Sequence, residues 1–219
     1  MRLSIGLVLI GGLLASGKAS AQGFYLDDQQ EGFGAALGAS TNDDATTLSL
    51  LAGYSFKGFI DAGTFLHRYS FDDTGPLDLT AIGLNPYVNV HLLRQNDSLP
   101  VSVAAMGNVQ KLFFSSDADG LDMSGWSMFL GGAVYRKIVL TDRFFMSPQA
   151  TLGFAHTSVT TEVQGLGENT EGEGTLFFQL AGNLGIRDDS GRIWAINPFL
   201  SIDEDNATFG LFAGIVLPR

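Results

Sequence analysis

The stretch TLFFQLAGNLGIRDDSGRIWAINPFLSID, which spans Thr175–Asp203, decides how this chain is interpreted. Two apolar stretches flank a charged turn at 188–191. Each is too short to cross a membrane as a helix, which needs about 20 apolar residues. Apolar side chains instead occupy alternate positions, namely Leu176, Phe178, Leu180, Leu184 and Ile186. Alternation with a period of two indicates β-strands with one apolar face. The question is whether a protein core or lipid covers that face.

The first 21 residues are interpreted as a signal peptide. A positive start at Arg2 precedes an apolar segment over 5–15, and Ala19-Ser20-Ala21 matches an A-x-A cleavage signal. The apolar segment is short for the alternative, an N-terminal membrane anchor. Cleavage would leave 22–219 as one domain. The chain contains no cysteine, so it has neither a disulfide nor a thiol for lipid attachment. An exported chain of this kind suits the bacterial envelope.

The net charge of the mature chain limits the classes of partner that it could bind electrostatically. Removing Arg2 and Lys18 from 12 basic residues leaves 10 against 23 acidic ones, a net charge of −13. Such acidity argues against nucleic acid or an anionic membrane surface as an electrostatic partner. Charged residues make up only 16% of the chain, whereas soluble domains usually carry about a quarter. We find no phosphate loop, thiol nucleophile or nucleotide fingerprint, and we expect no cofactor.

Segments with alternating apolar residues continue along the mature chain, separated by turn signals. We expect ten strands, near 33–41, 46–56, 59–70, 78–92, 99–112, 125–139, 143–161, 174–187, 192–202 and 206–217. Most reach the roughly 9–11 residues that a tilted membrane-spanning strand needs. The predicted fold is therefore all-β: a closed antiparallel up-and-down transmembrane β-barrel of about ten strands, with eight strands as the fallback.

The two faces of each strand differ in chemistry. In 78–92 one face carries Ile82, Leu84 and Val88, whereas the other carries Asn85 and Asn89. The polar face is small and mostly uncharged, unlike the Lys/Glu face of a soluble sheet, and it suits a partly hydrated lumen. We therefore expect the apolar face to contact lipid. A soluble periplasmic β-barrel that binds a small apolar ligand is the alternative, and it would turn the apolar face inward.

Connection lengths and charge suggest an orientation. With the N-terminus in the periplasm, we expect outside loops at 42–45, 71–77, 113–124, 162–173 and 203–205, and inside turns at 57–58, 93–98, 140–142 and 188–191. Long outside loops and short inside turns are typical of outer-membrane barrels. Acidic residues gather in the outside loops and basic residues at the inside end. Aromatic residues near strand ends would form two interface girdles: Phe33, Tyr54, Phe56, Phe59, Tyr69, Phe71, Phe113, Phe114, Trp126, Phe144, Phe145 and Trp194.

The segment Ser147–Phe154 opens a predicted strand with a proline and continues with an alternating pattern that includes Gly153. Two other predicted strands contain similar segments, Asn85-Pro86-Tyr87 and Asn197-Pro198-Phe199. In this the chain resembles the small bacterial outer-membrane β-barrel superfamily, the OmpA- and OmpW-type barrels. The resemblance implies an outer-membrane location, contact with outer-membrane lipid and lipopolysaccharide, and folding by the barrel-assembly machinery. Such barrels usually end on an aromatic residue, whereas this chain ends on Pro218-Arg219. We expect a non-enzymatic protein with a structural or narrow porin-like role.

A hydrolase is the main alternative function. His156 and Ser158 lie two residues apart and so share a strand face, and Glu168, Glu171 or Glu173 could orient the imidazole, with Glu171 as the preferred candidate. The pair looks like the His-x-Ser pattern of outer-membrane lipid A 3-O-deacylases, in which Ser is the nucleophile, His the base and Glu the orienter. Those enzymes follow the Ser with Asn, whereas Val159 stands here.

Two further groups of residues are candidates for binding or pairing. Asp117, Asp119 and Asp122 resemble part of a calcium loop, but Trp126 stands where such a loop needs its last acidic ligand, so a solvated acidic rim is the favoured interpretation. Asp61, His91, Lys137 and Arg187 fall on the predicted lumen faces. They could line a pore, or they could pair with one another and fill the lumen.

Overall fold

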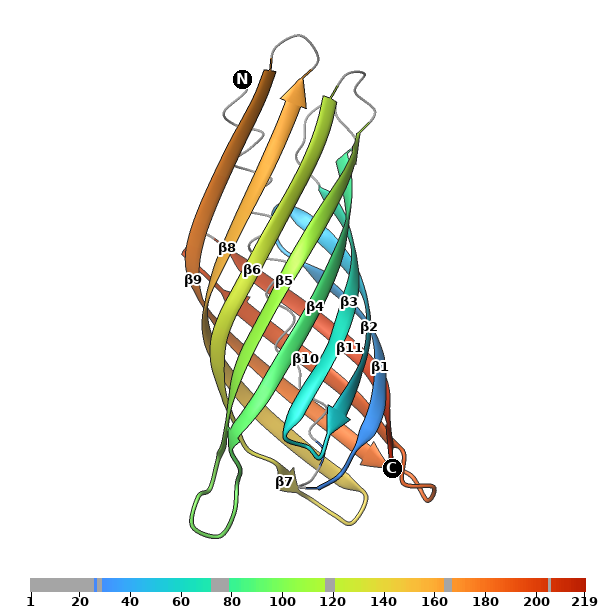
Figure 1. The fold of residues 1–219 in the computed structure, drawn as a ribbon. Coiled ribbons are helices and arrows are strands. Elements are labelled where there is room, and N and C mark those ends of the chain that lie inside the picture. The colour runs from blue at the N-terminus through green and yellow to red at the C-terminus, as the bar shows by residue number, and fades with distance from the viewer. Residues whose placement is uncertain (1–25, 27–28, 72–78, 117–120, 164–166, 205) are drawn as a thin grey trace.

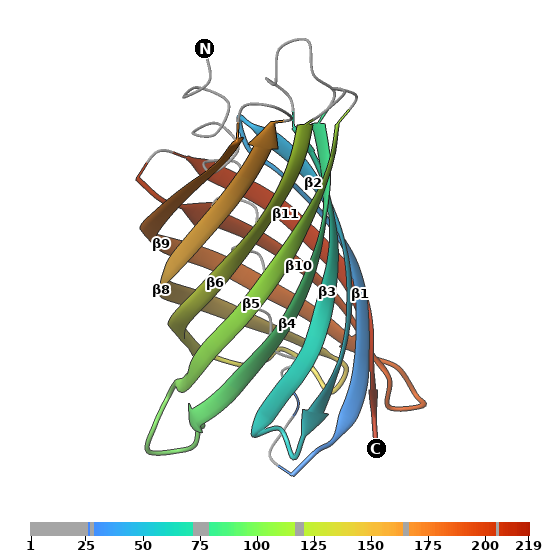
Figure 2. The same cartoon turned by 45° about the horizontal axis from the view of Figure 1, so that its top comes forward.

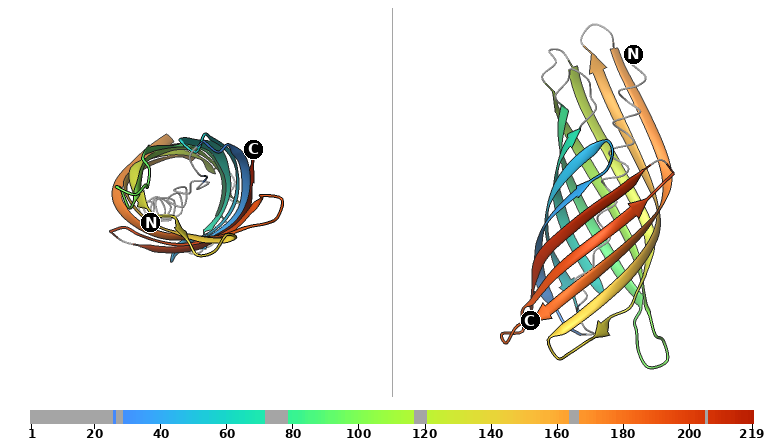
Figure 3. Two further views of the ribbon diagram at one scale, coloured as in Figure 1. Left: turned by 90° about the horizontal axis from the view of Figure 1, so that it is seen from below. Right: turned by 180° about the vertical axis from the view of Figure 1, so that it is seen from behind.

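The computed structural model describes residues 26, 29–71, 79–116, 121–163, 167–204 and 206–219 of the chain. Ten long antiparallel strands and one two-residue strand form a single sheet that closes on itself. The ring begins at β1, continues through β2, β3, β4, β5 and β6, passes from β6 to β8, and returns through β9, β10 and β11 to β1. Figure 1 shows the steep tilt of the strands, and Figure 3 shows the ring along its axis. The predicted fold class and strand count are confirmed.

The strands follow one another around the barrel in chain order. Their bounds are β1 Gly32–Thr41, β2 Ala45–Phe56, β3 Ile60–Phe71, β4 Leu79–Leu93, β5 Ser102–Ser116, β6 Leu121–Tyr135, β7 Ile138–Val139, β8 Phe144–Val163, β9 Gly167–Arg187, β10 Ile193–Ile202 and β11 Ala207–Pro218. The short β7 pairs only with β8. Among the described residues, no helix is long and apolar enough to span a membrane. The predicted signal peptide, 1–21, lies outside the described residues.

Two predicted outside loops are wrong. Most of 113–124 belongs to β5 and β6, and most of 162–173 belongs to β8 and β9, where Val163 pairs with Gly167. The connections left there, 117–120 and 164–166, are shorter than the connections 94–101 and 136–143 at the other end. The expected difference in loop length therefore fails. β6, β8 and β9 project beyond the other strands instead (Figure 1, and the right view of Figure 3), and Figure 2 shows this end turned toward the viewer.

Charge distinguishes the two ends of the barrel. We call the end with the connections after β1, β3, β5, β8 and β10 the acidic end, because most of the described acidic residues lie there, namely Asp43, Asp44, Asp122, Glu162, Glu168, Glu171, Glu173, Asp203 and Glu204, against Glu31, Asp97, Asp142, Asp188 and Asp189 at the opposite end. The opposite end, which also holds the C-terminus, is the basic end. It carries Lys57, Arg94, Arg136, Lys137, Arg143, Arg187, Arg192 and Arg219.

The apolar face of each strand points out of the barrel. In β9, Leu176 is 61% exposed, whereas the neighbouring Phe177 is 2% exposed and lies in the lumen. Phe178 continues this alternation and is exposed, as are Ile82 and Leu84 in β4. A sheet that closes with its apolar side chains outward needs an apolar solvent around it. The predicted direction of the two faces is confirmed.

Three prolines sit within strands without shifting the pairing. The β4–β5 ladder skips Pro86 and the β9–β10 ladder skips Pro198, and in both cases the register is the same on either side of the gap. Pro148 lies beyond the β6–β8 pairs, and its carbonyl accepts a hydrogen bond from the backbone N–H of Arg136 at 3.1 Å. A proline has no N–H to donate, so these gaps cost the closed sheet little.

The turn between β9 and β10 is organised by the Asp188 carboxylate. Its Oδ1 accepts hydrogen bonds from the Ser190 hydroxyl at 2.6 Å and the Ser190 N–H at 2.9 Å. Its Oδ2 accepts from Arg192 Nε at 2.8 Å and Trp194 Nε1 at 3.3 Å. The hydrogen bond from Ser190 is the largest cause that lowers the pKa of Asp188 well below its usual range, and Arg192 and Trp194 add to it.

Replacing Asp188 with asparagine is expected to lower the thermal midpoint of the folded form slightly at pH 7. Because the folded pKa lies below the unfolded value of about 3.9, the stabilisation is complete above that pH and is lost as the pH falls toward the folded pKa. The difference between the variant and the wild type should therefore shrink below about pH 4. Thermal unfolding at pH 7 and pH 2.5, with the exposed neighbour Asp189→Asn as control, measures it. An equal difference at both pH values would contradict this account.

Candidate functional site

A buried polar network occupies the lumen near the basic end. His91 Nε2 lies 3.0 Å from Asp61 Oδ2, and the Tyr135 hydroxyl lies 2.7 Å from His91 Nδ1. Asp61 is 1% and His91 4% exposed. A neutral imidazole satisfies both contacts when Nε2–H donates to the carboxylate and Nδ1 accepts from the tyrosine. The structure thus brings together two of the four predicted lumen residues, and it joins them to a tyrosine from β6.

The other two predicted lumen residues lie at the mouth of the basic end. Lys137 lines a cavity of about 570 Å³ together with His91, Arg94 and Tyr135. Its Nζ lies 4.7 Å from the centre of the Phe145 ring. Arg187 ends β9, and its backbone N–H donates to the Arg143 carbonyl at 2.8 Å. Both cations therefore sit where the lumen opens at the basic end.

A second polar layer lies in the lumen toward the acidic end. Gln110 Nε2 donates to the Tyr69 hydroxyl at 2.6 Å, and the Ser127 hydroxyl donates to Gln110 Oε1 at 3.1 Å. These three side chains come from β3, β5 and β6 and are all buried. Apolar side chains pack around them, including Met106, Phe129 and Phe177. The Ser49 hydroxyl and His67 Nδ1 form a further buried contact at 2.8 Å.

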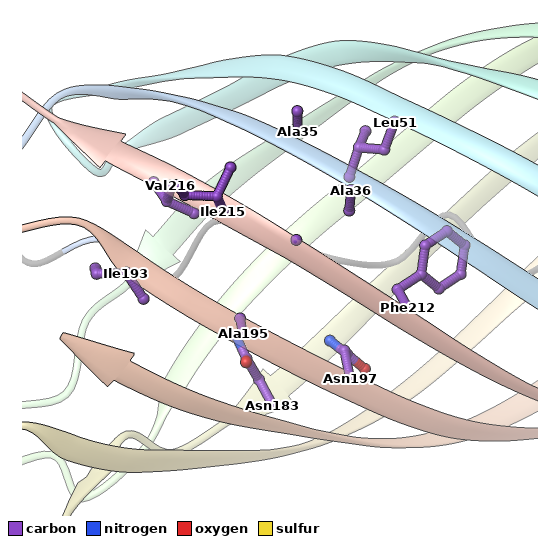
Figure 4. A pocket seen from close by; sticks show the side chains of 11 residues that line it. Ala35, Ala36, Leu51, Asn183, Ile193, Ala195, Asn197, Phe212, Ile215 and Val216 are labelled. Carbon is purple, nitrogen blue, oxygen red and sulfur yellow. The ribbon is translucent and has the colours of Figure 1, made fainter. Parts of the chain in front are cut away.

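Aromatic rings fill the middle of the lumen. Phe65 contacts Tyr87 and Phe212, with ring centres 5.2 and 6.0 Å apart, and Phe199 packs against Phe212 at 6.0 Å. The ring of Phe212 covers Gly38 so closely that a Cβ there would collide with it. Glycine is required at that position because the ring lies flat on its backbone. A cavity of about 50 Å³ remains beside this cluster, lined by residues of β1, β2, β9, β10 and β11, among them Ala36, Leu51 and Phe212 (Figure 4).

The three hydrolase candidates do not share a face of the sheet. His156 and Ser158 point out of the barrel, and His156 packs against Trp126 with ring centres 5.3 Å apart. Glu171 pairs across the ladder with Val159, which is buried in the lumen, so the carboxylate of Glu171 lies on the inner face. Side chains of adjacent residues in a strand point to opposite faces. The predicted orienting residue is therefore separated by the sheet from the predicted base.

The predicted acidic rim is described only in part. Asp117 and Asp119 lie outside the described residues. Asp122 lies at the start of β6, points outward and pairs across the ladder with Glu162, which in turn pairs with Glu168. Within the described ranges, no group of three His, Cys, Asp or Glu side chains is arranged to hold a metal ion.

Known proteins share this architecture without sharing the sequence. No family model matches the chain, and no curated protein sequence resembles it. The translocator domain of the autotransporter NalP from Neisseria meningitidis superposes with a TM-score of 0.62 at 9% identity, covering 98% of this chain and 96% of that domain. The chain has the fold of a small bacterial outer-membrane β-barrel. Two other solved structures superpose less well. The outer-membrane protease OmpT from Escherichia coli has a TM-score of 0.48 at 9% identity, covering 87% of this chain and 95% of that one. Ail from Yersinia pestis has a TM-score of 0.45 at 10% identity, covering 88% of this chain and 100% of that one.

The aromatic girdles of the barrel are confirmed in part. Phe33, Phe56, Phe59, Phe113, Trp126, Phe144 and Trp194 are exposed on the outer surface near strand ends. Tyr69, Phe71 and Phe145 were predicted to join them, but they are buried in the lumen. Phe114 is half-buried and packs against the lumen cluster. Position along the strand was right for all four, but they share the inward face, as their even spacing from His67, Gln110 or Gln149 on the same strand could have indicated.

Tyr135 is the residue of the lumen network that the sequence does not reveal. It reaches His91 from two strands away, because the intervening inward position on β5 is the small Ala104. Such a contact depends on the register of three strands. The only signal in the sequence is that Tyr135 shares the inward face of β6 with Ser127.

Proposed function

We propose that this protein is a non-conducting barrel of the bacterial outer membrane with a structural, non-enzymatic role. Its acidic end faces the cell surface, and the start of β1 and the end of β11 lie toward the periplasm. The single observation that carries the proposal is the filled lumen. Two layers cross it, one built on Tyr69, Gln110 and Ser127 and one on Phe65 and Phe212.

The dimensions of these layers favour a closed lumen over a narrow pore. A hydrated ion needs a continuous aqueous path, whereas the cavity beside the central aromatic cluster, about 50 Å³, holds only a few water molecules. The larger cavity, about 570 Å³, lies at the basic end, below the Asp61–His91 network. The network, being buried and mutually hydrogen-bonded, supports a packing role for these residues.

The outer surface supports the proposed location. Leucine, isoleucine, valine and aromatic side chains remain exposed around the barrel, and such a surface is stable only in contact with acyl chains. The separation of charge supports the orientation, because the projecting ends of β8 and β9 carry glutamates and threonines on both faces and suit water on both sides. The placement of Glu171 away from His156 and Ser158 supports a role without hydrolysis.

The purified barrel is expected to show no stable unit conductance in a planar bilayer. The physical reason is that two side-chain layers interrupt any aqueous path along the lumen. A variant with Phe65, Tyr69 and Phe129 all replaced by alanine opens both layers and serves as the detection control, with intermittent conductance expected. Heat-modifiable migration on a gel verifies that both proteins are folded. Stable channels from the wild-type barrel would overturn the closed-lumen proposal.

A further inference from the structure

Two basic residues break the charge separation of the barrel. Eight of the ten basic residues of 22–219 lie at the basic end, whereas Arg68 and Lys111 lie in the half of β3 and β5 nearer the acidic end. Both side chains point outward. Neither makes a hydrogen bond or an ion pair with any residue that the structure describes. Two cations thus stand without a counter-ion among the described residues, on the surface that faces lipid.

The surroundings of these cations are apolar. Arg68 lies between Leu48 and Ile82 on the neighbouring strands. Lys111 lies between Leu84 and Trp126. These four neighbours are all exposed on the outer surface. A cation there cannot remain in hydrocarbon, so its side chain must extend to a headgroup, where an anion can compensate its charge.

Hydroxyl side chains cover the outer surface one row beyond Arg68, and two rows beyond Lys111, where the exposed Phe113 lies between. Register pairs Thr41 with Thr46, Thr46 with Ser70, Ser70 with Thr80, and Thr80 with Ser115. We call these five residues the hydroxyl row. The outer surface therefore changes from apolar to hydrogen-bonding within one row of Arg68. This change places the boundary between acyl chains and headgroups at the level of the two cations.

The two cations are close enough to hold one anionic group. Ile82 and Leu84 lie two residues apart on β4, and they pair with Arg68 and Lys111 from opposite sides. Two strand spacings and a two-residue step put the two Cα atoms roughly 12 Å apart. Extended arginine and lysine side chains can both reach a phosphate between them, and a guanidinium offers it paired donors.

We propose that Arg68, Lys111 and the hydroxyl row form a binding site for the phosphorylated sugar headgroup of an outer-leaflet glycolipid such as lipopolysaccharide. The proposal rests on the proposed function, because it requires the acidic end to face the outer leaflet. The cations bind the phosphate, the hydroxyl row binds sugar hydroxyls, and the apolar surface below contacts the acyl chains. At an acidic end that otherwise repels anions, two cations give the lipid one defined position.

The test measures lipid binding by the folded full chain in detergent. Trp126 lies beside Lys111, so its fluorescence in a Trp194→Phe background reports on the site. Bisphosphorylated lipid A, the same lipid without phosphates, phosphatidylglycerol and inorganic phosphate are the probes. We expect lipid A to bind about tenfold or more tightly than its dephosphorylated form, and Arg68→Gln/Lys111→Gln to abolish that preference. Arg68→Lys should retain part of it, and Arg136→Gln at the basic end all of it.

Several outcomes would overturn the site. Equal binding of both lipid A forms, or an unchanged preference in the double variant with a normal heat-modifiable band, removes the role of the cations. Binding of phosphatidylglycerol as tight as that of lipid A, or full competition by inorganic phosphate, reduces the site to a general anion contact. Each of these results is compatible with a non-conducting barrel in the membrane, so each would overturn the lipid site and leave the proposed function intact. Stable dispersal of the chain in buffer without detergent would instead overturn the proposed function.

Discussion

Replacing Leu152 with arginine is expected to destabilise the folded barrel in lipid by about 2–4 kcal/mol, the cost of a cation near the bilayer midplane. Leu152 is 63% exposed and lies on β8 about midway between the aromatic Phe144 at the basic end and the hydroxyl-bearing Thr160. On a soluble protein, a substitution at so exposed a position usually changes stability by no more than about 0.5 kcal/mol. The large effect is expected only if acyl chains surround this side chain.

Denaturant titration of the barrel in phospholipid vesicles, read from the heat-modifiable gel shift, measures this difference. Leu152→Ala is the matched control, because it removes the same apolar side chain without adding a charge. A second control, Thr160→Arg, puts the same charge in the register row of Arg68, at the proposed boundary with the headgroups, where the cost falls to about 0–1 kcal/mol. If all three variants were equally stable, the outer surface would have to face water, and the membrane assignment would be lost.

The alternation of single strands was enough to predict much of this fold. The ten segments and their faces follow from side chains such as Leu84 and Asn85, because lipid and lumen impose opposite chemistry on adjacent positions. That signal stops where the strand leaves the membrane. Between Glu168 and Glu173 both faces of β9 contact water, so the sequence reads as a loop although the ladder with β8 continues. For this reason the predicted strands stop at 112, 125, 161 and 174, whereas β5, β6, β8 and β9 continue toward the acidic end to 116, 121, 163 and 167.

To predict the candidate site, one would need the register between strands as well as the face on which each side chain lies. Asp61 and His91 were both placed in the lumen from alternation, but their contact depends on how β3 meets β4. Asp61 pairs across the ladder with Asn89, so His91 lies on the diagonal, two residues further along β4. Diagonal neighbours remain within reach of long side chains. The two strands are joined through 72–78, which is longer than the two-residue turns that fix the register of a hairpin, so this pairing could not be predicted.

The Asp61–His91 pair should be the most sensitive point of the lumen. Replacing His91 with alanine is expected to cost about 3–5 kcal/mol, because it leaves a buried carboxylate without its imidazole partner. The same change also deprives the Tyr135 hydroxyl of its contact with Nδ1. Denaturant titration in vesicles, as for Leu152, measures the loss of stability, and Lys137→Ala at the exposed mouth provides a control with a much smaller expected effect.

A double variant distinguishes the energy of the Asp61–His91 contact from the contributions that each side chain makes with its other neighbours. If the broken Asp61–His91 contact causes most of the loss in stability, adding Asp61→Ala to His91→Ala should cost less than the sum of the two single substitutions, because the double variant breaks that one contact only once. Residues that do not interact would give additive losses instead. Additivity within about 0.5 kcal/mol would therefore mean that the 3.0 Å contact contributes no stability of its own. Asp61 and His91 would then be held in place by the surrounding packing alone. A clear shortfall from additivity would show that the Asp61–His91 contact itself stabilises the folded barrel.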